Sequence, residues 1–179
     1  MICPACGHDN FPGRESCSNC LHDLTQLDRP VSRDRVERSL MENPVGGVLP
    51  PRDPITVHPT ATIQDAIAVM LANDVGALLV VDQQGSLLGI FSERDLLTKV
   101  AGLHPSYREL PVGQFMTSKP ETIAAEAPLA YVVHKMDVGG YRHVPVVVGD
   151  GRPSGMVSVR DILRHITRAC KKSELRGRH

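Results

Sequence analysis

Four of the five cysteines lie in the first twenty residues, as two Cys-x-x-Cys pairs: Cys3, Cys6, Cys17 and Cys20. Two such pairs, separated by a short polar loop, place four thiolates around one Zn²⁺ in the tetrahedral geometry that this ion prefers. Two disulfides or four free thiols are the alternatives. Because four sulfurs complete the coordination shell, we expect a closed, structural zinc site, with the neighbouring His8 and His22 outside it.

A second pattern occurs twice, 66 residues apart and without a gap, at Gly89–Asp95 and Gly155–Asp161. Each copy is an apolar strand opened by glycine, then a Ser-x-x-Asp step, then a predicted helix. Ser-x-x-Asp at a helix start is close to a capping box, and Thr62-x-x-Asp65 shows the same pattern with no reason to suspect a ligand. The step could instead bind a nucleotide: a helix N-terminus offers free N–H groups to phosphate, and an aspartate accepts hydrogen bonds from both ribose hydroxyls.

A basic pair, Arg142 and His143, precedes an apolar run in the second copy. Arginine is a permanently charged, bidentate clamp for phosphate. A solvated arginine in a turn and a histidine at the edge of the core are the alternatives. The first copy has Gly76 and Ala77 at the equivalent positions, so we predict that the site around Asp161 binds a ligand more tightly.

The composition of the 179 residues is that of a small globular protein. Hydrophobic residues make up 41% but aromatic residues only 3%, so the core must be built from Val, Leu, Ile, Met and Ala. The formal net charge of zero argues against a strong field toward nucleic acid or a membrane. We expect no membrane span, and reduced thiols without an export signal predict a cytoplasmic protein.

Strands and helices must position the residues of the two motifs. The apolar pattern predicts these elements in the order strand, helix, strand, strand, helix. The first repeat is predicted to contain strands at Ile55–Val57, Ala77–Val81 and Leu87–Phe91, a helix after Thr62 and a helix at Glu93–Val100. A helical turn at Val112–Met116 connects it to the second repeat, which has Pro128 at the first helical position and a strand at Val144–Val148. Neither half can bury its sheet face alone, so we expect an α+β fold in which two βαββα repeats pack about a pseudo-twofold axis.

The flanking segments carry weaker signals. Residues 24–47 mix both charges with proline and glycine, which predicts a linker, with a short helix at Ser32–Met41 capped by Ser32. Residues 171–179 form a basic tail, which is either a solvated helix end or an arm that contacts a partner or nucleic acid. Cys170 has no partner in the sequence, and we expect it to be inert.

Taken as a set, the Gly-h-h-Ser-x-x-Asp motifs, the Pro-x-Thr openings at Pro54 and Pro120, and the Arg-His-Val-Pro-Val-Val run at 142–147 resemble a tandem pair of CBS domains, a Bateman module. The resemblance places one CBS domain at residues 48–104 and the other at 105–170. Members of that family often dimerise and bind adenosine-containing ligands (AMP, ADP, ATP, sometimes NAD or S-adenosylmethionine) in the clefts between repeats.

The resemblance also implies roles for particular positions. The aspartates of the motifs correspond to the ribose-binding position, the serines to a hydroxyl near the phosphate, and the Pro-x-Thr strands to the lining of the adenine. The implied nucleotide-binding set is Thr56, Val57, Ser92, Arg94, Asp95, Thr122, Ile123, Arg142, His143, Ser158, Arg160 and Asp161. Residues 1–23 resemble the short N-terminal zinc ribbons of many prokaryotic regulatory proteins, in which the ribbon usually mediates contacts.

Three functional hypotheses follow, and none is enzymatic, because no nucleophile–base constellation is present. The leading hypothesis is a ligand-sensing regulatory homodimer, in which an adenosine nucleotide bridges the CBS units and the zinc ribbon contacts an unknown protein partner. The second is a nucleic-acid-associated protein that uses the ribbon and the basic tail, with the CBS pair as dimeriser; the zero net charge disfavours it. The third is a structural dimer with empty clefts.

Overall fold

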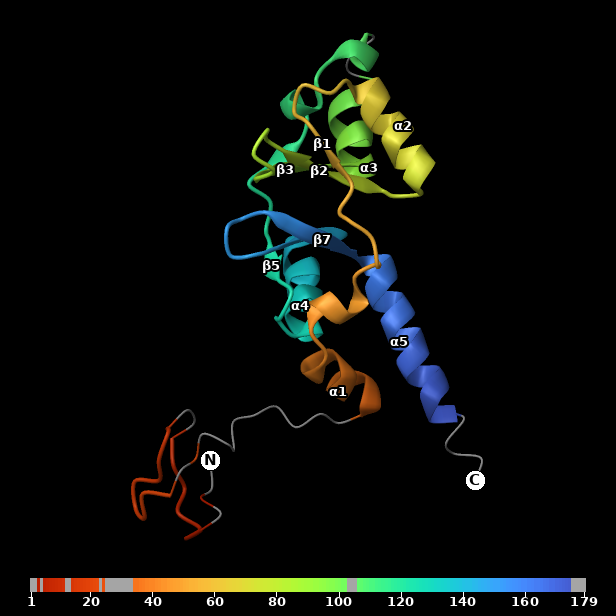
Figure 1. Ribbon diagram of the computed structural model, residues 1–179. Helices are drawn as coiled ribbons and strands as arrows, with labels where there is room; N and C mark the ends of the chain where they lie inside the picture. The colour runs from red at the N-terminus through yellow and green to blue at the C-terminus, as the bar shows by residue number, and fades with distance from the viewer. Residues whose placement is uncertain are drawn as a thin grey trace. The chain divides into compact units, whose positions relative to one another are not determined.

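The computed structural model describes residues 3, 5–11, 14–22, 24, 34–102 and 106–174, with backbone alone for 172–174. The chain divides into two compact units, Met1–Asp34 and Arg35–His179. The first unit carries the cysteine pairs and the second carries both repeats (Figure 1). No helix among the described residues is long and apolar enough to cross a membrane.

The first repeat folds in the predicted order. Its elements are β1 (Thr56–Val57), α2 (Ile63–Asn73), β2 (Ala77–Val81), β3 (Leu87–Ser92), α3 (Glu93–Asp95) and the π-helical turn η2 (Leu96–Val100). β4 (Thr117–Ser118), from the connection between the repeats, completes a sheet of order β1-β2-β3-β4, in which only β1 and β2 are parallel. Thr62 caps α2, because its side chain accepts a hydrogen bond from the backbone N–H of Asp65.

The second repeat reproduces this arrangement. Its elements are β5 (Ile123–Ala124), α4 (Leu129–Gly139), β6 (His143–Val147), β7 (Pro153–Ser158) and α5 (Val159–Glu174), with sheet order β5-β6-β7. The strand register repeats at the 66-residue offset: Val57 pairs with Val80, and Ile123 pairs with Val146. Pro128 is the N-cap of α4, one position before the predicted one. The α+β fold with two equivalent units is therefore confirmed.

The two sheets face each other, and helices cover their outer sides: α2 and α3 on the first sheet, α4 and α5 on the second (Figure 1). Alternate residues of β2 point to opposite faces. Leu78 and Val80 pack with Phe91 in the cluster that also contains α2 residues, whereas Ala77 and Leu79 pack toward Met156 of the second sheet. Burial of both faces explains the continuous apolar run of β2.

Each repeat is completed by the segment that precedes the other one. η4 (Val112–Gln114), a 3₁₀ turn at the predicted helical turn, and β4 pack on the first repeat. α1 (Arg35–Glu42) and η1 (Val45–Val48) pack on the second, where Val45 is fully buried and its N–H donates to the Ala127 carbonyl at 2.8 Å. From Arg35 onward, the predicted linker 24–47 thus belongs to the larger unit, because its apolar side chains pack in the core of the second repeat. Ser32, the predicted cap of its helix, lies outside the described residues.

This arrangement explains the glycines that open both motifs. A Cβ on Gly89 would lie 2.6 Å from the Met116 sulfur and 2.9 Å from the Thr117 carbonyl oxygen. A Cβ on Gly155 would lie 2.8 Å from Leu49 Cδ1. The glycines therefore make room for the incoming connecting segments, and they are not evidence of a ligand.

Candidate functional site

Both Ser-x-x-Asp steps form capping boxes with the same geometry. Asp95 Oδ2 accepts hydrogen bonds from Ser92 N at 2.9 Å and Ser92 Oγ at 2.6 Å. Asp161 Oδ2 accepts the same pair from Ser158, at the same two distances. The capping interpretation is confirmed for both copies. One oxygen of each aspartate is used by the cap, so any difference between the sites lies at the other oxygen, Oδ1.

Asp95 Oδ1 is occupied by a lysine of its own repeat and a threonine of the connection between the repeats. Lys99 Nζ lies 2.6 Å from it, and Thr117 Oγ1 donates a hydrogen bond at 3.0 Å. The same ammonium donates to the Phe115 carbonyl at 3.0 Å. The Asp95 residue is only 6% exposed. Burial alone would raise the pKa of Asp95, but the Lys99 and Ser92 donors outweigh it and hold this pKa below its usual value.

Asp161 Oδ1 has a partner with fewer other contacts. Arg164 Nη1 donates to it at 3.0 Å, and the Arg164 side chain is 51% exposed. Lys99 is 41% exposed but also donates to the Phe115 carbonyl and to Thr117 Oγ1. His165 stands at the position equivalent to Lys99, but its Nε2 hydrogen-bonds Ser39 Oγ of α1 at 2.8 Å. A ligand that displaces one exposed guanidinium therefore gains access to the Asp161 carboxylate.

Each aspartate borders a cavity built by both repeats. The Asp95 cavity has a volume of about 310 Å³ and includes residues of the second repeat between Lys119 and His143. The Asp161 cavity has a volume of about 640 Å³ and includes residues of the first repeat between Pro50 and Leu96. Both volumes fall in or near the range of small-molecule sites, roughly 300–1,000 Å³.

Arg142 and His143 line both cavities. Their presence therefore does not distinguish the Asp161 site, contrary to the reason given for tighter binding there. The 66-residue offset assigned this pair to the second copy alone. In the structure, the start of β6 lies between the two cavities, so both side chains reach both of them. Burial lowers the pKa of His143, against the opposing influence of the nearby carboxylates of Glu93 and Asp161, so this imidazole is held toward its neutral form.

The other predicted residues divide into those at a cavity and those away from both. Arg94 lines the Asp95 cavity and donates to the Gly140 carbonyl at 3.1 Å, and Arg160 lines the Asp161 cavity. Four predicted residues are absent from both walls: Thr56, Val57, Thr122 and Ile123. The chain reaches the cavities just before these strands, at Pro50, Arg52 and Lys119–Glu121.

Sequence reasoning also missed the partners of the aspartates. Lys99 was readable, since it lies four residues after Asp95, the spacing at which helical side chains meet. Arg164 lies three residues after Asp161, which is the other such spacing. Thr117 and Arg52 carried no sequence signal, because only the fold of the connecting segments brings them to the cavities.

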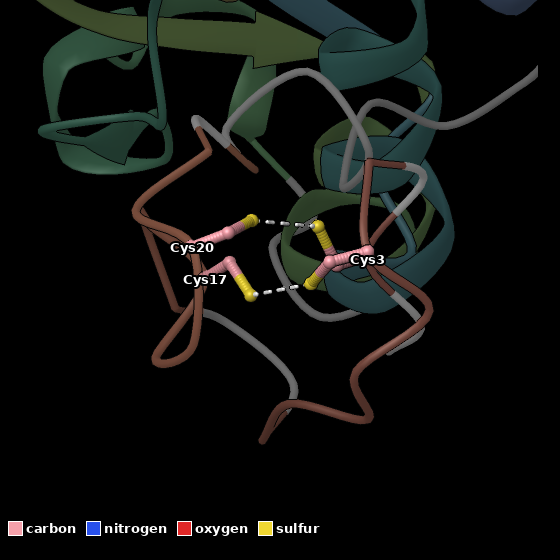
Figure 2. A group of neighbouring side chains, drawn as sticks. Cys3, Cys17 and Cys20 are labelled. Carbon is pink, nitrogen blue, oxygen red and sulfur yellow. Dashed lines mark hydrogen bonds between the residues drawn. The ribbon is translucent and has the colours of Figure 1, made fainter.

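The four cysteines of the first unit form a separate cluster. Their sulfurs all lie within 4.8 Å of one another, and the pairs Cys3–Cys20 and Cys6–Cys17 are 3.7 Å apart. Figure 2 shows the side chains of Cys3, Cys17 and Cys20 directed toward a common centre. Sulfurs about 2.3 Å from a tetrahedral zinc ion would be about 3.8 Å apart. The two 3.7 Å pairs thus match the edges of a metal-centred tetrahedron, and no S–S bond joins these cysteines.

The backbone around the cluster has an internal repeat. The Cys3 carbonyl accepts from Gly7 N, and the Cys17 carbonyl accepts from Leu21 N. Gly7 and Leu21 both have positive φ, 72° and 58°. Buried Asn10 joins the two turns, because its Nδ2 donates to Cys17 Sγ at 3.5 Å and its Oδ1 accepts from Ser18 N at 2.9 Å. Glycine adopts this conformation without steric cost, whereas the fold imposes it on a leucine in the second turn.

Hydrogen bonds lower the pKa of Cys6 and Cys17, whereas at Cys20 a backbone hydrogen bond from His22 is outweighed by the neighbouring thiols and burial, which raise the pKa of this thiol to about 12. Burial raises the pKa of Cys17, but donors from the backbone of Cys20 and Asn19 and from the Asn10 side chain outweigh it and lower this pKa to about 6. Asn19 Nδ2 lies 3.6 Å from Cys6 Sγ. The side chains of His8 and His22 are exposed, and neither belongs to the four-sulfur group.

Comparison with known proteins gives the second unit a family. The sequence profile of the CBS domain matches residues 45–102 and 112–168. An uncharacterized 17.7 kDa protein of Acidianus ambivalens is 33% identical over 110 residues, which cover 60% of this chain and 64% of that relative. The chain therefore spans less than two thirds of the length of this relative.

Two solved structures share the fold and were determined with ligands. CBSX2 in complex with AMP has 25% identity and a TM-score of 0.61, covering 70% of this chain and 97% of that one. The CBS domain pair of protein MJ0100, in complex with 5-methylthioadenosine and S-adenosyl-L-methionine, has 27% identity and a TM-score of 0.64, with the same coverage. With two matched repeats over more than half of its length, this chain belongs to the CBS domain family.

Proposed function

We propose that this chain is a non-enzymatic regulatory protein that binds an adenosine nucleotide in the clefts of its CBS pair, most tightly in the Asp161 cavity. One observation carries the proposal. A preoriented carboxylate borders a cavity of about 640 Å³, and one exposed arginine side chain covers its available oxygen.

The residues support a simple binding sequence. Ser158 holds Asp161 Oδ2 through two hydrogen bonds, which fixes the orientation of the carboxylate. Arg164 leaves Oδ1, where a ribose hydroxyl donates in its place. The released guanidinium then pairs with phosphate, which it binds in a bidentate manner. Arg164 thus exchanges its ion pair with Asp161 for one with the phosphate. Because an exposed ion pair contributes little to stability, breaking it to admit the ligand costs little free energy.

The relatives support the ligand class. CBSX2 binds AMP, and the MJ0100 pair binds two adenosine compounds that carry sulfur. Both share the two-repeat fold with this chain. The common feature of their ligands is the adenosine moiety, which is the part that a ribose-binding aspartate would recognise.

A thermal-shift and calorimetric panel of AMP, ADP, ATP, NAD and S-adenosylmethionine tests the proposal. A ligand at about 100 times its dissociation constant adds roughly 2.7 kcal/mol to the free energy of unfolding. We expect at least one compound to stabilise the wild-type chain and to lose this effect in Asp161→Asn. Arg152→Gln is the matched control, since this exposed arginine pairs only with Asp150 in the β6–β7 turn among the described residues. No shift with any compound would favour a structural dimer with empty clefts.

We also propose that the first unit is a zinc ribbon that holds one structural Zn²⁺ through Cys3, Cys6, Cys17 and Cys20, and that it contacts a protein partner. The 3.7 Å sulfur pairs support the ion, whose binding would supply on the order of 10 kcal/mol of folding free energy to this unit. The free thiols also support a reducing compartment such as the cytoplasm. Elemental analysis should find one zinc per chain, and none in Cys17→Ser. Wild-type protein without zinc would contradict the assignment.

Homodimerisation through the CBS pair is the last part of the proposal. Leu97 and Leu163 occupy equivalent positions after the two motifs, and they are 70% and 58% exposed. A pair of apolar side chains related by the pseudo-twofold suits a symmetric interface. Light scattering should give twice the mass of the chain, and Leu97→Glu with Leu163→Glu should give a monomer. A monomeric wild-type chain would exclude the dimer.

A further inference from the structure

The Asp161 cavity has more arginines than one phosphate group requires. Four arginines line it: Arg52, Arg142, Arg160 and Arg164. Three carboxylates line it as well: Asp74, Glu93 and Asp161. One guanidinium binds one phosphate through two parallel hydrogen bonds, so a monophosphate would leave most of this set unused.

Two of these arginines make only long, exposed contacts with the rest of the protein. Arg160 Nη1 lies 3.7 Å from Asp74 Oδ2, and both side chains are largely exposed, 74% and 97%. Arg52 Nη1 reaches the Asn73 carbonyl at only 3.5 Å. Exposed pairs of this kind contribute about 0–1 kcal/mol, so an anionic ligand recruits the guanidinium groups at little cost.

The Asp95 cavity is smaller and has fewer arginines. It has half the volume, and two arginines line it, Arg94 and Arg142, against four in the Asp161 cavity. Arg94 also donates to the Gly140 carbonyl. An extended anion therefore fits the Asp161 cavity better in both volume and number of guanidinium groups.

We propose that the Asp161 cavity selects an adenosine di- or triphosphate over the monophosphate, and over S-adenosylmethionine, whose sulfonium is cationic. Arg164 and Arg142 take the first phosphate beside the ribose. Arg160 and Arg52, contributed from the start of α5 and from the segment before β1, take the phosphates beyond it. The inference rests on the proposed nucleotide binding and adds the class of nucleotide.

Calorimetric titrations of AMP, ADP, ATP and S-adenosylmethionine in buffer without divalent cations test this selection, with inorganic tripolyphosphate as a probe that lacks adenosine. One additional charge-assisted contact of about 1.4 kcal/mol corresponds to a tenfold change in affinity. We expect ATP to bind at least tenfold more tightly than AMP, and tripolyphosphate to compete with ATP. The ATP affinity should also fall more steeply than the AMP affinity as salt rises from about 50 to about 300 mM.

Two substitutions locate the effect. Arg160→Gln and Arg52→Gln should each lower the ratio of ATP to AMP affinity by about tenfold, whereas Arg152→Gln in the β6–β7 turn should leave this ratio unchanged. Equal or tighter binding of AMP or S-adenosylmethionine would overturn the selectivity while the proposed nucleotide binding stands. An unchanged ratio in both arginine variants would overturn the roles of these residues. No binding of any adenosine compound would overturn the proposed function itself.

Discussion

Asp95 and Asp161 have the same local structure and different surroundings. In both, Oδ2 closes a capping box with the serine three residues earlier. At Asp95, the other oxygen is held by Lys99 and Thr117, whereas at Asp161 it is held by the exposed Arg164. The comparison shows that the motif specifies a helix cap, and that tertiary neighbours decide what holds the other oxygen of the carboxylate.

The neighbours differ for identifiable reasons. After Asp95 the chain makes the short π-helical turn η2, and Lys99 lies in it. After Asp161 the helix continues regularly as α5, and the equivalent His165 bonds Ser39. Thr117 reaches Asp95 from β4, whereas the corresponding segment before β1 offers prolines, which have no hydroxyl. In the first site, Oδ1 of the aspartate is thus occupied by a lysine and a threonine of the chain.

Asp161→Asn and Asp95→Asn should separate the two sites most strongly. We expect Asp161→Asn to weaken ATP binding by about a hundredfold, since it removes the charged acceptor for the ribose, equivalent to about 2.7 kcal/mol. Asp95→Asn should change the affinity of the same site less than threefold. Titration calorimetry measures both. Similar losses in the two variants would mean that the cavities bind ligand equally.

The same two substitutions should have the opposite order of effects on stability, with Asp95→Asn the more destabilising. Asp95→Asn should lower the free energy of unfolding by about 2 kcal/mol, because the cap and the contacts with Lys99 and Thr117 are weakened together. Asp161→Asn should cost about 1 kcal/mol, since Arg164 is exposed and loses little. Urea unfolding monitored by circular dichroism gives both values. A larger loss for Asp161→Asn would argue against the closed state of the Asp95 site.

Lys99→Met tests whether the lysine closes the first cavity. The substitution keeps most of the side-chain volume and frees Asp95 Oδ1 from its cation, at a cost of about 1 kcal/mol in stability. We expect a second, weaker nucleotide site in calorimetry of this variant. Lys171→Met, on the exposed end of α5, is the control and should leave one site. A Lys99→Met chain with unchanged stoichiometry would show that cavity volume alone excludes the ligand.

The smallest effect should come from His143, which both cavities share. Its pKa is lowered from the ordinary 6.5 by burial, so the unfolded chain takes up a proton at a higher pH than the folded chain does. The contribution of neutral His143 to the free energy of unfolding is therefore fully present above pH 6.5. It is lost as the pH falls below 6.5 toward the pKa of His143 in the folded chain. We expect a loss of no more than about 1 kcal/mol between pH 7 and 5.5.

Urea unfolding across this pH range should show the loss in the wild type and remove it in His143→Asn. His134→Asn, on the exposed face of α4, serves as control. A wild-type curve that is flat over the range would mean that His143 ionises equally well in the folded chain.

The fold was readable from the sequence because the repeat has no gap. The order of strands and helices and the cap at Thr62 depend on residues close in sequence, and they were predicted correctly. For Ser92 and Ser158, the capping alternative is the one that the structure confirms. The composition of the cavities was not readable. Arg52 and Thr117 enter them from connecting segments, and Arg142 lies where the two cavities meet, so their places depend on how the repeats pack.

The most direct test of unequal sites is a crystal structure of the wild-type chain grown with excess ATP. We expect electron density for one nucleotide per chain, in the Asp161 cavity, with the ribose hydroxyls on Asp161 and Arg164 turned to the phosphates. The Lys99–Asp95 pair should remain intact. Density for a ribose on Asp95, with Lys99 displaced, would contradict the account.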